Sequence, residues 1–133
     1  MADARSEQVR EWMVRASDDL RAAAAPIDSG ITGPSLFHCQ QAGEKAIKAL
    51  LVWHDVPFGK THDLVALIDN GSRIVPELAG WTRAAAILTP LASLFRYPGA
   101  DLEPGRDDAE SAMGHARGIY GFVLSQLPGE ARP

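Results

Sequence analysis

Apolar residues recur at spacings of three and four along most of the chain, and this period is typical of α-helices. Residues 6–25 predict a first helix, which Pro26 should close because proline lacks the N–H that continues a helix. Residues 27–34 hold two glycines, a serine and a proline and predict a loop. A second helix is predicted from about Pro34 to Trp53, since proline suits a first helical turn. The apolar stripe of the first helix consists of Val9, Met13, Ala16, Leu20 and Ala23.

The middle of the chain predicts shorter helices that are interrupted by turn residues. Thr61 can cap a third helix with Asp63 in its first turn, and Gly71 should end that helix. A further apolar helix is predicted from about Trp81 to Phe95. Pro90 lies inside this helix, so we expect a kink there or a break into two short helices.

The end of the chain predicts one more long helix. Asp107 or Asp108 can cap it, and its apolar residues follow the helical repeat as far as Leu127. Residues 128–133 cannot continue a helix and predict a frayed tail. No useful strand alternation occurs, so the chain predicts an all-α, up-and-down bundle of four or five helices. Its 133 residues fit a single domain, residues 1–133, with a core from about 6 to 127 and short flexible tails.

Three glycines, Gly114, Gly118 and Gly121, share one face of the predicted last helix. Each glycine inside a helix costs about 1 kcal/mol relative to alanine. We therefore predict that another helix approaches closely at this face. The alternative is that a small, alanine-rich protein tolerates these glycines.

Charge and composition narrow the class of protein. A net charge of −4 and a pI near 5.5 argue against a protein that coats nucleic acid by general electrostatics. Between residues 38 and 62, however, three histidines and three lysines face only two acids, Glu44 and Asp55. This region is either a solvated face or an anion-facing pocket. Neither a signal-peptide pattern nor a run of about 20 apolar residues is present, so we expect a cytoplasmic protein that does not contact membranes.

The sequence lacks the residue patterns that several kinds of chemistry need. The histidines are too scattered to predict a metal site, and no HExxH or CxxC pattern occurs. No glycine-rich phosphate loop follows a strand, so we expect no cofactor. Cys39 lies on the apolar side of the second helix, where a thiol usually behaves as a small hydrophobic group rather than as a nucleophile.

The second helix carries the strongest set of polar residues: Gln41, Glu44, Lys45 and Lys48. Gln41 and Lys45, like Glu44 and Lys48, are four residues apart and therefore neighbours on the helix surface. One interpretation is an exposed face with a weak ion pair. The other is a buried network in which Glu44 orients an arginine near a cavity, with Arg96 as the first choice.

Two further segments carry candidate site residues. His62 follows Lys60 at the predicted start of the third helix, where free backbone N–H groups favour an anion such as phosphate. Tyr97 follows Arg96 and offers a ring on which a base could stack. The alternatives are that His62 caps or packs locally and that Tyr97 is half-buried core.

Three sequence motifs resemble the HEPN family of small helical proteins: FHCQQAGEKAIKALL at residues 37–51, KTHDL at 60–64 and RYP at 96–98. The resemblance covers nearly the whole chain. It implies a helical bundle that forms homodimers, often beside a nucleotidyltransferase-like partner, in prokaryotic toxin or defence systems. Many members are metal-independent ribonucleases, in which an arginine is followed after four to six residues by a histidine.

The chain departs from that ribonuclease motif. After Arg96, the positions of the expected histidine hold Asp101, Leu102 and Glu103, and no other arginine has a histidine at this interval. Loss of an imidazole removes a general acid–base contribution of about 10²–10⁴-fold, so we lean towards a protein that is not an enzyme. His62 from a neighbouring helix or subunit could replace the missing group, with Arg96 stabilising the phosphorane charge.

The sequence supports three hypotheses. The preferred one is a non-enzymatic or weakly active, dimeric HEPN component of a toxin–antitoxin or defence-type system, which binds a nucleotide or RNA, or a nucleotidyltransferase-like partner. Its candidate ligand-binding residues are Gln41, Glu44, Lys45, Lys48, Lys60 and Tyr97, beside His62 and Arg96. The second is a metal-independent endoribonuclease toxin with Arg96 and His62 as the catalytic pair. The third is a purely structural protein-interaction domain.

Overall fold

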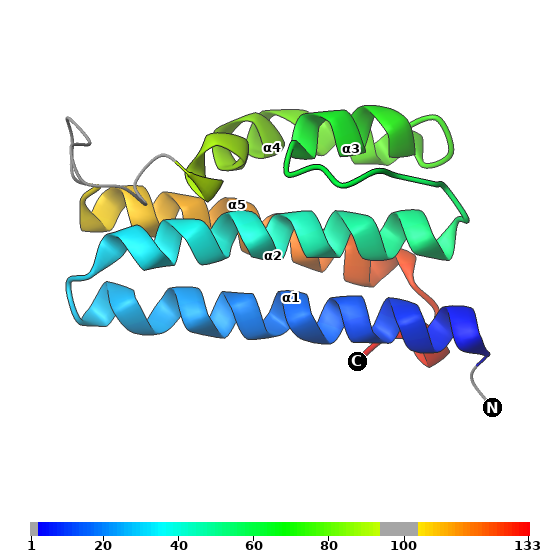
Figure 1. Cartoon of the computed structure of the whole chain (residues 1–133), viewed down its shortest axis with the longest axis horizontal. Helices are drawn as coiled ribbons and strands as arrows, with labels where there is room; N and C mark the ends of the chain where they lie inside the picture. The colour runs from blue at the N-terminus through cyan, green and yellow to red at the C-terminus, as the bar shows by residue number, and fades with distance from the viewer. Residues whose placement is uncertain (1–2, 94–103) are drawn as a thin grey trace.

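The computed structural model describes residues 3–93 and 104–133. Three long helices form its body: α1 (Ala4–Asp28), α2 (Thr32–Trp53) and α5 (Arg106–Gln126). In Figure 1 their axes are closely aligned, and α2 and α5 both run opposite to α1. The predicted all-α bundle is confirmed, with no strand in the described residues. Phe95, Arg96, Tyr97 and Pro98 lie outside the described residues.

Helix α2 is the centre of the bundle. It packs on α1, on α5 and on a group of shorter elements that cover its other side: α3 (Leu64–Gly71), α4 (Thr82–Leu88) and the 3₁₀ helix η2 (Thr89–Ala92). The prediction that Cys39 lies on the apolar side of α2 is confirmed, because Cys39 is fully buried together with Ala46 and Ile47. No helix in the described residues is long and apolar enough to span a bilayer.

Helix α1 is longer than predicted, because it continues past Pro26 to Asp28. Proline lacks the N–H for one helical hydrogen bond. In the last turn of a helix few residues follow the proline, so few further hydrogen bonds can be disturbed. The extra residues also bring Ile27 into the core, where it is 8% exposed. Gly30, at φ 75°, then reverses the chain, so only residues 29–31 separate the two long helices.

The third helix also begins differently from the prediction. Its N-cap is Asp63, whose carboxylate accepts hydrogen bonds from the N–H groups of Val65 (3.0 Å) and Ala66 (3.2 Å). Thr61, the predicted cap, instead accepts from the N–H of Asp63 through its hydroxyl (3.1 Å). A carboxylate at this position suits the positive end of the helix dipole. The anion-binding N–H groups predicted beside His62 are therefore already occupied by a side chain of the protein.

The predicted break at Pro90 is confirmed. The 3₁₀ helix η1 (Pro76–Trp81) leads into α4, and α4 gives way to η2 at Thr89. The hydroxyl of Thr89 donates to the carbonyl of Ala85 (2.7 Å) and accepts from the N–H of Leu64 (3.1 Å). One side chain thus joins the end of α4 to the start of α3.

Both ends of α5 correct the sequence-based prediction. Gly105 is its N-cap, and Asp108 reaches back from the first turn to accept from the N–H of Gly105 (2.8 Å). Residues 128–133 are not frayed: the 3₁₀ helix η3 (Gly129–Ala131) packs on α1, and Ala131 is fully buried. Arg10 of α1 donates to the carbonyl of Arg132 (3.2 Å). The buried methyl group of Ala131 and the side chain of Arg10 therefore hold residues 128–133 against α1.

Of the three glycines on α5, only Gly118 is closely approached. The neighbour is the indole of Trp81, at the end of η1, rather than the backbone of another helix. A β-carbon at Gly114 or Gly121 would meet nothing within 4 Å. The prediction of a shared close-packed face is thus wrong for those two positions within the described chain.

Candidate functional site

Two buried carboxylates organise the polar residues of α2. Glu44 lies on α2 itself and is 4% exposed, whereas Asp19 comes from α1 and is 8% exposed. Each is surrounded by cationic or hydrogen-bonding side chains. Burial of a carboxylate is costly unless such partners compensate it, so each of these two groups requires cationic or hydrogen-bonding neighbours.

Glu44 is held by side chains from two segments. Its Oε1 lies 2.7 Å from Nδ1 of His62 and accepts from Nε2 of Gln40 (3.1 Å). Its Oε2 accepts from Nζ of Lys48 at 3.2 Å. The second interpretation of the polar stripe, a buried network, is thus the one that the structure bears out for Glu44 and Lys48. The expected arginine, Arg96, lies outside the described residues.

Gln40 ties the segment that carries His62 to α2. Its side-chain amide donates to Glu44 and also to the backbone carbonyl of His62 (3.0 Å). The carbonyl of that amide accepts from Nε2 of Gln41 (2.8 Å). Gln40 is fully buried, and sequence reasoning missed it. A glutamine directly before the polar stripe was the available signal.

The imidazole of His62 is anchored on one edge and open on the other. Its side chain is 73% exposed, while the side chain of Glu44 behind it is 6% exposed. Because Nδ1 faces the carboxylate, the ring donates that N–H to Glu44, and Nε2 is left as the group available to solvent. The carboxylate also orients the ring, as hydrogen-bonded carboxylates do for functional histidines in many proteins.

Lys48 is a buried cation with partners on both sides. Its side chain is 10% exposed, and besides Glu44 it meets the rings of Phe58 (5.5 Å) and Trp12 (5.9 Å). These distances fit cation–π contacts. The ammonium group is therefore used within the fold, so Lys48 supports the site from beneath rather than facing a ligand.

Asp19 forms a second cluster that sequence reasoning missed. It pairs with Lys45 (Nζ to Oδ2, 2.5 Å) and with His38 (Nδ1 to Oδ1, 2.8 Å). Asp19 lies between Ala16 and Ala23 on the buried stripe of α1. An acid within an apolar stripe was the signal, because such a residue needs a cation from a neighbouring helix.

The remaining predicted residues are not all brought together. Lys60 is exposed two residues before His62 and makes no ion pair with another described residue. Arg96 and Tyr97 lie outside the described residues, so their pairing with His62 stays a prediction. Within residues 3–93 and 104–133, no group of three His, Cys, Asp or Glu side chains could hold a metal ion.

Cys39 is expected to resist alkylation in the folded protein. It is fully buried, and this desolvation raises the pKa of its thiol from 9.0 to about 12. Since the folded state holds this proton more tightly, the thiol's contribution to stability is full below pH 9 and is lost as the pH rises towards about 12. Mass spectrometry after iodoacetamide treatment, with and without urea, measures how readily the Cys39 thiol is alkylated in the folded and in the unfolded protein. Rapid modification of the folded protein would contradict it.

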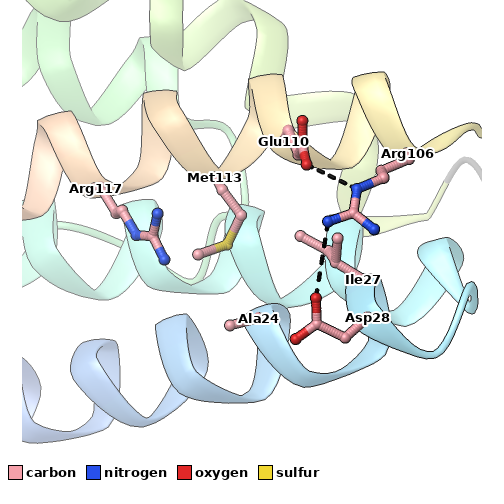
Figure 2. A pocket seen from close by; sticks show the side chains of 7 residues that line it. All are labelled: Ala24, Ile27, Asp28, Arg106, Glu110, Met113 and Arg117. Carbon is pink, nitrogen blue, oxygen red and sulfur yellow. Dashed lines mark hydrogen bonds and ion pairs between the residues drawn. The ribbon is translucent and has the colours of Figure 1, made fainter.

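A hollow of about 420 Å³ lies between the end of α1 and the first turns of α5 (Figure 2). Arg106 bridges Glu110 (2.8 Å) and Asp28 (3.8 Å) at one end, and Arg117 lies at the other. None of the residues predicted from the sequence lines it. Its charges largely compensate each other, and it is separate from the Glu44 cluster.

Comparison with known proteins shows which solved structures and which family this chain resembles. The chain resembles TT1696 from Thermus thermophilus, at 27% identity and a TM-score of 0.80, covering 90% of this chain and 98% of that one. It also resembles ST0689, an archaeal HEPN homologue, at 25% identity and a TM-score of 0.73, with the same coverage. Among curated proteins, none matches significantly. The model of the HEPN domain matches residues 9–126, and the chain therefore belongs to the HEPN family.

Proposed function

We propose that the protein binds the phosphate group of an RNA or a nucleotide at the open edge of His62, as a component of a toxin–antitoxin or defence-type system. The observation that carries this proposal is the contact of 2.7 Å between Nδ1 of His62 and the buried carboxylate of Glu44. A ring anchored in this way presents Nε2 to solvent in one orientation. Such preorganisation lowers the entropic cost of binding.

Positive charge near His62 comes from Lys60, whereas the neighbouring carboxylate of Asp63 is used as the N-cap of α3. Lys60 is exposed two residues before His62 and adds an ammonium group to the same segment. When the imidazole carries a proton on both nitrogens, Nε2 can donate to a phosphate oxygen while Nδ1 keeps its contact with Glu44. Because the chain as a whole has a net charge of −4, binding depends on this local arrangement rather than on overall attraction.

The assembly is part of the proposal. Membership of the HEPN family supports a homodimer and a nucleotidyltransferase-like partner protein. In a dimer, residues of both copies could line one ligand, and the partner protein would then act on it or control access to it.

A metal-independent ribonuclease is a second candidate function. The Glu44–His62 contact favours it, because a carboxylate-bound imidazole is a common general base for a 2′-hydroxyl. Arg96 would supply the positive charge that stabilises the phosphorane. This alternative makes His62 a catalytic residue rather than a binding residue.

RNA binding tests the proposal. Wild-type protein should bind labelled single-stranded RNA in EDTA, and His62→Ala should weaken binding about tenfold or more, the usual effect of one hydrogen bond to a charged group. His115→Ala, which changes a histidine on α5, should leave the affinity unchanged. Measurement at two salt concentrations separates the phosphate contribution, since affinity falls as salt rises.

The same reactions separate the two functions. Cleavage of the RNA by wild type, but not by His62→Ala or Arg96→Ala, would establish the ribonuclease. Binding without cleavage would favour the binding component. An affinity that His62→Ala leaves unchanged would show that His62 is not part of the site.

A further inference from the structure

Two aromatic rings lie next to the Glu44 cluster and were not among the predicted site residues. Trp12 comes from α1 and Phe58 from the connection between α2 and α3. Their centroids are 6.4 Å apart, with an interplanar angle of 72°. Both side chains are partly exposed although they pack on the core. An edge-to-face pair that stays partly open is an adaptable surface for another flat ring.

Each ring lines a hollow in the surface. Gln8 belongs to both hollows, so they adjoin beside it. The hollow at Trp12 has a volume of about 250 Å³ and the hollow at Phe58 about 530 Å³. The other residues of the first are Glu11 and Arg15, and those of the second are Val52, Asp55, Val56 and Pro57.

The aromatic pair is joined to His62 through one ion pair. Lys48 contacts both rings and donates to Oε2 of Glu44, while Oε1 of the same carboxylate holds His62. Glu44 and Lys48 are one helical turn apart, which is a rise of about 6 Å. A ligand with a phosphate at one end and a flat ring at the other has the two kinds of group that these two places on one side of α2 fit.

We propose that Trp12 and Phe58 form a base-binding subsite, in which a nucleobase of the bound RNA or nucleotide stacks on an aromatic face. This inference rests on the proposed function and deepens it. Aromatic side chains bind bases of any sequence in this way, because every base has a π-face. The side-chain amide of Gln8, between the two hollows, can both donate to and accept from the edge of the base.

The surroundings favour a base over a cationic ligand. Aromatic pairs also bind quaternary ammonium groups, but Lys48 already supplies a cation to both rings. Lys48 would repel a second cation, and of the two acids that line the hollows, Glu11 and Asp55, Glu11 is already paired with Arg15 (3.3 Å). A nucleobase is neutral and flat, and the nucleotide carries its negative charge on the phosphate, towards His62.

Calorimetry with AMP and ribose 5-phosphate tests the subsite. Trp12→Leu should weaken AMP binding about 5- to 150-fold, the range for loss of one stacked base, and leave ribose 5-phosphate unaffected. Trp81→Leu is the matched control, since Trp81 is also partly buried against a phenylalanine, at 6.0 Å from Phe122. Its affinity for AMP should equal that of wild type. Circular dichroism checks that both variants fold.

Fluorescence gives a readout that a merely structural role would not change. Trp12, Trp53 and Trp81 are the three tryptophans of the chain. In a variant with Trp53→Phe and Trp81→Phe, AMP should quench the remaining emission by stacking on Trp12, while ribose 5-phosphate should not.

The outcomes separate the inference from the proposed function. Binding of AMP and RNA that Trp12→Leu leaves unchanged would overturn the aromatic subsite and leave the His62 site standing. No binding of RNA, AMP or ribose 5-phosphate to wild type would overturn both. Equal quenching by AMP and ribose 5-phosphate would also contradict stacking.

Discussion

Replacing Glu44 with alanine is expected to destabilise the protein by about 3–5 kcal/mol, the usual cost of removing one partner from a buried ion pair. The side chain of Lys48 is 10% exposed and would remain as a buried ammonium without its carboxylate. The amide of Gln40 and the imidazole of His62 would lose an acceptor at the same time. Urea unfolding followed by circular dichroism measures the loss.

The chain offers a matched control for this substitution. Glu110 also forms an ion pair with a basic residue four positions away, Arg106, but on the surface, where the two side chains are 53% and 62% exposed. Glu110→Ala should change the free energy of unfolding by no more than about 1 kcal/mol. Equal effects of the two substitutions would contradict the buried network.

A compensating change tests the cause. If the unpaired ammonium accounts for most of the loss, Lys48→Met added to Glu44→Ala should recover much of the stability, because it removes the buried charge. A double variant as unstable as the sum of the single ones would show that Glu44 and Lys48 act independently.

Gly118→Leu is expected to destabilise the protein by about 1–3 kcal/mol, the usual cost of overpacking. A β-carbon at this position would lie 2.5 Å from Cζ3 and 2.8 Å from Cη2 of Trp81. An indole ring is rigid, so the whole side chain would have to move away from α5. Thermal unfolding measures this effect, and near-UV circular dichroism reports the displaced tryptophan.

The two neighbouring glycines provide the control for that prediction. At Gly114 and Gly121, a β-carbon would meet nothing within 4 Å. Alanine at either position should therefore stabilise the protein, by up to about 1 kcal/mol, through its higher helix propensity. Loss of stability in Gly114→Ala would indicate that this face is covered by a partner or a second copy.

The long helices could be predicted from the sequence, whereas several of their ends could not. Periodicity places α1, α2 and α5 correctly, and Pro90 breaks the chain where local rules expect it. At Pro26, the local rule is overridden because burial of Ile27 stabilises one more stretch of helix. At the start of α3, Asp63 rather than Thr61 is the cap, a choice between two good candidates that depends on the path of the preceding chain.

For the candidate site, the sequence by itself determined that Gln41, Glu44, Lys45 and Lys48 share one side of α2, because helical spacing is a property of the local backbone. The tertiary structure decided which partner each residue meets. Lys45 pairs with Asp19 and Glu44 with His62, residues 26 and 18 positions away, and Gln40 turns inward to hold the segment that carries His62. Such pairs form only when packing of the helices brings distant segments within hydrogen-bonding distance, and no local pattern encodes that distance.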